Sequence, residues 1–184
     1  MKIAFVLILL TASAFAQDQA AVATAEAVCG PSNIKFDVKQ DTTQHPTPQP
    51  ETGRAMVYVV EDLGQCPDCV AHSKGLGLTD VDQALIKVGV DGAWVGAIQG
   101  SSYLFFAADS GEHHVCINWQ SRLGIRSRAF AMANFTAEEA KVYYLRARVF
   151  PGRDDYSFDL DLVNSDQGKF LVASSAFSVS HPKK

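Results

Sequence analysis

The chain has 184 residues, 47% of them hydrophobic, and a formal net charge of −4 at pH 7 from 16 basic and 20 acidic residues. This length suits a single domain with a sizeable core. The acidic balance argues against nucleic acid or an anionic lipid surface as the main partner, because both attract clustered cations.

The first residues have the pattern of a secretory signal peptide. Lys2 supplies a positive start, residues 3–10 form an uninterrupted apolar run, and Ala14-Phe15-Ala16 gives the small residues that precede a cleavage site. The run is too short to span a bilayer as a mature helix. We therefore expect residues 1–16 to be removed, and the remaining chain, without a transmembrane segment, to reach the periplasm or the cell exterior.

Four cysteines lie beyond the expected cleavage point, and an even number in an exported chain predicts disulfides. Cys66-Pro67-Asp68-Cys69 is close enough to close on itself. Cys29 and Cys116 would then form a long-range bridge. Four cysteines allow three pairings, so the sequence leaves the connectivity open.

The segment before the main domain divides into three parts. Residues 17–28 are polar and Ala-rich and predict a mobile leader. Ile34, Phe36 and Val38 alternate with charged residues, as in a half-buried strand. Residues 40–52 have no apolar core residue and place proline at positions 46, 48 and 50, which favours an extended linker across a surface. We assign residues 29–52 to this strand and linker, and 53–184 to a β-sandwich domain.

A strand is expected over Gly53–Val60, because Met56 to Val60 are consecutive β-favouring residues, as in a strand buried on both faces. Residues 61–82 contain the two close cysteines and little periodicity, so we expect a long loop there. Long loops in compact domains often carry function.

The clearest local signal is a hairpin. Ile86, Val88 and Val90 alternate up to Asp91-Gly92, a pair typical of a type I′ turn, and residues 93–98 return. A strand over 100–107 and a turn at 109–112 follow. The next strand has two faces: His113, Val115, Ile117 and Trp119 on one, and His114, Cys116, Asn118 and Gln120 on the other.

The C-terminal third predicts further strands over 130–135 and 141–150. Phe158, Leu160 and Leu162 are expected to face inward. Ser165–Ser174 fits either a short helix that packs Phe170 and Leu171 or a last strand. The whole pattern predicts an all-β, mainly antiparallel single β-sandwich of about seven to nine strands, with room for one short C-terminal helix.

Two clusters outside the expected core are candidate sites. Cys66 and Cys69 have the spacing of a metal or redox pair, and His114 with Cys116 could complete a four-ligand zinc set. That set would leave Cys29 unpaired, so disulfides are the preferred interpretation. The second cluster is a basic loop that could bind a partner, although a solvated loop explains it as well; it comprises Arg122, Arg126 and Arg128.

No catalytic signature is present. The chain has no G-x-S-x-G elbow, no H-E-x-x-H pair and no glycine loop that would cradle a phosphate, so we predict no catalytic residue and no cofactor. The aromatic residues on the predicted strands are most simply core residues. A sugar- or peptide-binding face would need two or three of them together at the surface.

Val88-Gly89-Val90-Asp91-Gly92-Ala93-Trp94-Val95-Gly96 resembles the hairpin of the PEGA-type β-sandwich modules of bacterial envelope proteins. Ser110-Gly111-Glu112-His113-His114-Val115-Cys116-Ile117 is similar to their second element, with Ser110 where proline is usual. With the strand at 142–146, the chain also resembles an uncharacterised exported bacterial family known only as a domain of unknown function. The resemblance covers roughly residues 53–178 and implies a β-sandwich in the bacterial envelope, without an activity.

Together these observations predict a non-enzymatic, exported binding or structural module of the bacterial cell envelope. The expected partner is a cell-wall polymer or another envelope protein. The alternative is a metal-binding or thiol-redox protein that uses Cys66, Cys69, His114 and Cys116.

Overall fold

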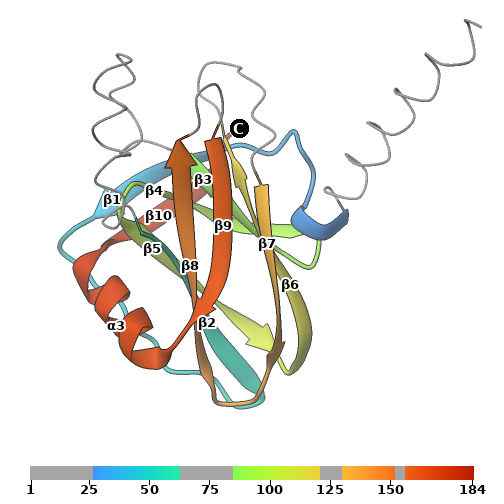
Figure 1. Cartoon of the computed structure of the whole chain (residues 1–184), viewed down its shortest axis with the longest axis vertical. Coiled ribbons are helices and arrows are strands. Elements are labelled where there is room, and N and C mark those ends of the chain that lie inside the picture. The colour runs from blue at the N-terminus through green and yellow to red at the C-terminus, as the bar shows by residue number, and fades with distance from the viewer. Residues whose placement is uncertain (1–26, 63–84, 121–129, 152–155) are drawn as a thin grey trace, which may run out of the picture.

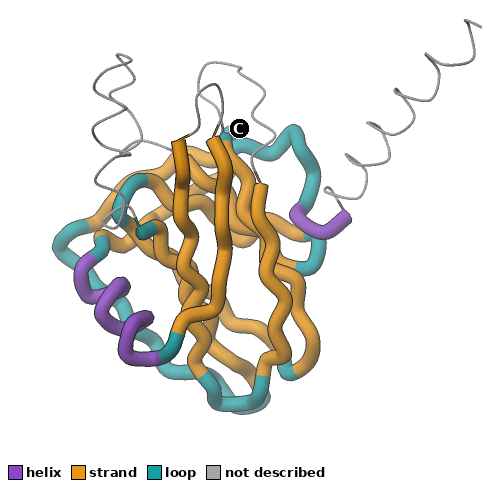
Figure 2. Tube along the Cα trace, in the orientation of Figure 1, coloured by secondary structure: helices purple, strands orange, loops and turns teal. Residues whose placement is uncertain are grey.

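The computed structural model describes residues 27–62, 85–120, 130–151 and 156–184. The described chain is mostly β; helix α3 (Ser165–Ser174) lies against one face, and residues 27–29 form a short helical segment (Figures 1 and 2). The predicted all-β sandwich is confirmed, and the described residues form ten strands where about seven to nine were expected. The strands are β1 (Phe36–Asp41), β2 (Arg54–Glu61), β3 (Leu85–Val90), β4 (Ala93–Gln99), β5 (Ser102–Asp109), β6 (Gly111–Trp119), β7 (Phe130–Ala137), β8 (Val142–Pro151), β9 (Tyr156–Val163) and β10 (Ala176–Pro182).

The strands form two sheets. The six-stranded sheet has the order β1-β10-β5-β2-β8-β9, and the four-stranded sheet has the order β4-β3-β6-β7. Two pairings, β2 with β8 and β10 with β5, are parallel, and the others are antiparallel. The sheets approach each other at both lateral edges, because β9 lies beside β7 and β4 lies beside β10 and β1.

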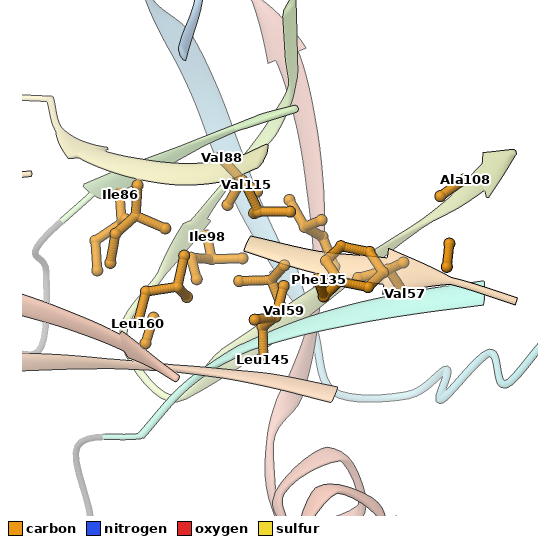
Figure 3. Packing of buried hydrophobic residues seen from close by; sticks show 14 of the residues in the cluster. Val57, Val59, Ile86, Val88, Ile98, Ala108, Val115, Phe135, Leu145 and Leu160 are labelled. Carbon is orange, nitrogen blue, oxygen red and sulfur yellow. The ribbon is translucent and has the colours of Figure 1, made fainter. Parts of the chain in front are cut away.

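The main core fills the space between the sheets. Period-two alternation directs one face of each strand inward, so the core takes side chains from both sheets (Figure 3). Val57, Ile86 and Leu145 are fully buried there. Each such side chain contributes about 1.5–3 kcal/mol of transfer free energy. Every residue of β2 from Ala55 onward is buried, which confirms the predicted two-sided burial.

The predicted hairpin is confirmed in its backbone. Asp91 and Gly92 both have positive φ, 48° and 84°, as a type I′ turn requires. The turn joins β3 to β4, and a bulge between Val88 and Gly89 shifts the register of the pair. This local twist brings Trp94 opposite Gly89, which matters for the segment that crosses this face.

Ser165–Ser174 is a helix, and a last strand follows it as β10. Asn164 begins the helix, because its side-chain oxygen accepts the backbone N–H of Gln167 at 2.9 Å. Leu171 and Val172 are buried, but Phe170 is 70% exposed, so its predicted packing was wrong. Positions 168, 171 and 172 share one helical face, and position 170 lies on the opposite one.

Leu162 corrects a second prediction. Its side chain is 43% exposed, although alternation placed it inward with Leu160. β9 is the last strand of its sheet and is hydrogen-bonded to β8 alone. A side chain near the end of an edge strand has few neighbours to cover it, so alternation alone overstated its burial.

Candidate functional site

A segment before β1 crosses the outer face of the four-stranded sheet. We call residues 27–35 the N-terminal strap. A disulfide joins Cys29 in the strap to Cys116 in the middle of β6, with a Cα–Cα distance of 5.5 Å. Both cysteines are buried, 3% and 0% exposed. This is the long-range pairing that the sequence suggested, and it fixes the start of the described chain to the centre of a sheet.

The glycines of the hairpin allow the strap to lie close to the sheet. Gly89 is paired with Cys116 across β3 and β6. A Cβ at Gly89 would lie 2.2 Å from the carbonyl oxygen of Cys29, and one at Gly92 would lie 2.5 Å from that of Ala27. The N–H of Gly92 donates to the Val28 carbonyl at 2.7 Å. The two glycines of the hairpin motif therefore allow close backbone contact with the strap, in addition to forming the turn.

Two side chains of the sheet bind further strap carbonyls. The indole N–H of Trp94 donates to Pro31 at 2.8 Å, and Lys87 Nζ donates to Ile34 at 3.1 Å. The Lys87 ammonium also lies 4.1 Å from the centroid of the Trp94 ring, a cation–π contact. Trp94 and Lys87, on the outer face of this sheet, are thus both bonded to the strap.

Gln120 holds the end of the strap at β1. Its side-chain oxygen accepts the N–H of Phe36 at 2.6 Å, and its amide donates to the Phe36 carbonyl at 2.7 Å. A hollow of about 380 Å³ opens beside this pair. Its wall has two cations, Lys35 and Lys183, and the latter is paired with Asp37 at 2.8 Å. The lining of the hollow offers no nucleophile paired with a base.

A second cluster of side chains covers the outer face of the six-stranded sheet. We call it the tyrosine face; it consists of Tyr58 on β2, Tyr103 and Phe105 on β5, Tyr144 on β8 and Phe177 on β10. The Tyr58 ring lies 5.3 Å from that of Tyr144 and 6.2 Å from that of Tyr103, measured between centroids. α3 covers one part of this face through Leu171 and Val172.

The phenols of the tyrosine face stay protonated at neutral pH. Burial raises the pKa of Tyr58 to about 12, with further contributions from Tyr144 and Tyr103. Burial also raises the pKa of Tyr103 and of Tyr144. The three hydroxyls are therefore hydrogen-bond donors and acceptors and not bases at physiological pH.

The linker with alternating prolines crosses the tyrosine face. We call residues 45–50 the proline segment. The hydroxyl of Tyr103 donates to the carbonyl of Pro46 at 3.3 Å, and that of Tyr58 donates to the carbonyl of Pro48 at 3.2 Å. His45 stacks on Tyr103 at 6.4 Å between ring centroids. The sequence predicted a surface linker, and the structure adds the surface that the linker contacts.

The strand ends next to the segments 63–84, 121–129 and 152–155 gather at one end of the sandwich (Figure 1). They are the ends of β2, β6 and β8 and the starts of β3, β7 and β9. Cross-strand ion pairs join β8 to β9 in this region: Arg146 bonds Asp161 at 2.9 Å, and Arg148 bonds Asp159 and Asp161. Pairs of this kind fix the register of the two strands more than they stabilise them.

The remaining predicted site residues fall into two groups. Cys66, Cys69, Arg122, Arg126 and Arg128 lie outside the described residues, as does the expected signal peptide. His114 is described, and its side chain is 55% exposed.

The four-ligand zinc set is not formed in this structure. Cys116 is bonded to Cys29 and has no thiolate to offer a metal. No cluster of three or more metal-ligating side chains occurs among the described residues. The described part of the chain also contains no helix long and apolar enough to cross a membrane.

Sequence reasoning missed the strap and the tyrosine face because both depend on long-range contacts. The strap is bonded to Cys116, which follows Cys29 by 87 positions, and to Lys183, whose N–H donates to the Lys35 carbonyl. One signal was available for the tyrosine face, since prolines at every second position of an extended chain point to the same side and could pack on one surface.

Comparisons with known proteins returned no similar protein: no family model, no curated protein and no solved structure matches the chain.

Proposed function

We propose that this chain is an exported, non-enzymatic binding module of the bacterial cell envelope, whose partner is a cell-wall polymer or another envelope protein. The observation that carries the proposal is the disulfide between Cys29 and Cys116. Disulfides of this kind persist in oxidising compartments and are rare in the cytosol. The expected signal peptide at residues 1–16 leads to such a compartment.

The architecture supports a binding role. Two packed sheets form a scaffold, and the ends of β2, β6 and β8 lie at one end of it with the starts of β3, β7 and β9 (Figure 1). Binding residues are often placed on loops that a rigid scaffold positions. The titratable groups of the described part also support a role without catalysis. The phenols of the tyrosine face stay neutral, and His113 is engaged on both ring nitrogens, by Asp91 and by the Asp109 carbonyl.

Export is tested by expressing the chain with and without residues 1–16 in a Gram-negative bacterium. We expect the complete chain to be shortened at its N-terminus and recovered outside the cytoplasm, and the truncated chain to stay in the cytoplasm. Equal recovery of both chains from the cytoplasm would contradict export.

Binding is tested by sedimenting the purified, oxidised protein with isolated cell wall and by cross-linking it in intact envelopes. We expect a saturable association with the wall or with a defined envelope protein. A matched control is the Cys29→Ser/Cys116→Ser variant, which lacks the bridge and should bind more weakly in proportion to its loss of folded protein. Absence of saturable binding in both experiments would contradict the proposal.

A further inference from the structure

The proline segment contacts the tyrosine face with a period of two residues. Pro46, Pro48 and Pro50 are half-buried, whereas Thr47 and Gln49 between them are exposed. The prolines therefore face the sheet and the polar side chains face away from it. This is how an extended peptide lies on a binding surface, with alternate side chains toward its receptor.

The spacing of the tyrosines matches the backbone of an extended chain. Tyr103 and Tyr58 donate to the carbonyls of Pro46 and Pro48, two residues apart. Residues two apart in an extended chain are separated by about 6.5 Å, and the two rings are 6.2 Å apart. The two phenols thus recognise main-chain carbonyls, and the surrounding rings provide the apolar surface that proline favours. Aromatic surfaces bind proline-rich peptides by the same chemistry.

Few hydrogen bonds join the proline segment to the six-stranded sheet. Within the described residues its hydrogen bonds to the sheet are the two from the tyrosine hydroxyls, at 3.3 and 3.2 Å, which are long for O–H···O bonds. Its flanks are fixed independently, since Asp41 accepts the N–H groups of Thr43 and Gln44, and Arg54 begins β2. Release of the segment would therefore leave the hydrogen bonds of both sheets intact.

We propose that the tyrosine face is a peptide-binding site that its own proline segment occupies, and that its partner is an extended peptide with prolines at alternate positions, carried by another envelope protein. The inference rests on the proposed binding function and names the chemistry of the partner. The proline segment acts as a competitor in the same chain. Its effective concentration is on the order of millimolar, so it limits binding to partners that are abundant or tethered nearby.

The test uses a fluorescent peptide with the sequence of residues 43–52 and the complete oxidised chain. In the variant Pro46→Ser/Pro48→Ser/Pro50→Ser the competitor is weakened, and we expect this variant to bind the peptide at least about tenfold more tightly than the wild type does. A control peptide with the three prolines replaced by serine should bind at least tenfold more weakly. Adding Tyr58→Phe and Tyr103→Phe removes both donors, and each should weaken binding by about five- to tenfold.

Failure of the folded triple variant to bind the peptide, or binding that the two Tyr→Phe changes leave intact, overturns the inference. If the triple variant does not fold, wild-type protein is titrated with millimolar peptide by NMR, and the absence of peptide-dependent shifts on β2 and β5 overturns it instead. Concentration-dependent dimerisation of the wild type, abolished by the tyrosine changes, would assign the face to a second copy and overturn the assignment to a partner. Envelope binding that persists in the Tyr58→Phe/Tyr103→Phe variant would overturn this inference and leave the proposed function standing.

Discussion

His113 on β6 and Asp91 in the β3–β4 turn are joined, with Nδ1 of the imidazole 2.6 Å from a carboxylate oxygen. The second ring nitrogen lies 2.7 Å from the carbonyl oxygen of Asp109. Both partners are acceptors, so the arrangement is complete only when both nitrogens carry a proton. The imidazole, which also packs on Phe135, therefore links the β3–β4 turn to the β5–β6 turn as a cation.

This link predicts a pH-dependent contribution to stability. Partial burial alone would lower the pKa of His113, but the hydrogen bonds to Asp91 and Asp109 and the charges of both carboxylates outweigh it and raise the pKa. The stabilisation is therefore complete below the ordinary histidine pKa of about 6.5 and is lost as the pH rises through the raised value. Asp91 is partly desolvated, which alone would raise its pKa, but hydrogen bonds from the His114 backbone N–H and the His113 side chain outweigh this and lower the pKa. The stabilisation that the Asp91 carboxylate contributes is therefore lost only in acid.

The measurement is urea unfolding of wild type and His113→Gln between pH 4.5 and 9. We expect the wild type to be more stable by about 1 kcal/mol near pH 5.5, and the difference to shrink above neutrality. His114→Gln is the matched control, since its side chain is 55% exposed and lies 3.8 Å from Asp91. It should change stability by less than about 0.5 kcal/mol. A His113→Gln difference that does not vary with pH would contradict the assigned charge state.

Gly89→Ala should loosen the N-terminal strap. The added methyl would lie 2.2 Å from the Cys29 carbonyl oxygen, which is backbone and cannot rotate away. We expect a loss of about 1–3 kcal/mol in the free energy of unfolding. Faster amide hydrogen exchange should appear at Gly92, whose N–H is bonded to the strap. Unchanged stability and exchange would show that the strap does not need this close approach.

Gly168→Ala tests how closely α3 packs on the tyrosine face. Alanine is normally better than glycine inside a helix by about 1 kcal/mol. Here the methyl would lie 2.1 Å from Cγ of Tyr144, so we expect destabilisation instead. In a Tyr144→Ala background the space is open, and the same change should become neutral or stabilising. Calorimetry of the wild type, the two single variants and the double variant measures this reversal of sign, and its absence would contradict the packing.

Truncation of two neighbouring residues of α3 should change the free energy of unfolding by very different amounts. Leu171 is 6% exposed and Phe170 is 70% exposed. Leu171→Ala should cost about 2–4 kcal/mol, because it leaves a cavity under the helix. Phe170→Ala, which removes the larger side chain, should change stability by less than about 0.5 kcal/mol. Chemical denaturation of the two variants gives the comparison, and a larger cost for Phe170→Ala would reverse the assigned orientation of the helix.

Local patterns predicted most elements of this fold, because those patterns depend on neighbours in sequence, but they did not indicate β10 (Ala176–Pro182). Asp91-Gly92 specified a turn that needs positive φ at both positions, and the apolar run at Met56–Val60 indicated a strand buried on both faces. The burial of side chains on edge strands was predicted less well. Alternation placed Leu162 inward, but it cannot indicate that β9 is an edge strand.

The features of the candidate sites depend on contacts between distant segments. Nothing near Gly89 in sequence indicates that the Cys29 carbonyl will lie against it, and nothing near Pro46 indicates a phenol from Tyr103. Such contacts follow from the order of strands in the two sheets, which period-two patterns do not encode. The cysteines were an exception, since four cysteines allow only three pairings, which limited the disulfides before any fold was known.

The most direct test is mass-spectrometric mapping of cysteine pairs in protein isolated from the envelope after alkylation without reduction. We predict a cross-linked peptide pair that contains Cys29 and Cys116, at close to full occupancy, in a chain that begins after residue 16. Recovery of Cys29 and Cys116 as separately alkylated thiols in natively folded protein would contradict an oxidised, exported module whose N-terminal strap is fixed to β6.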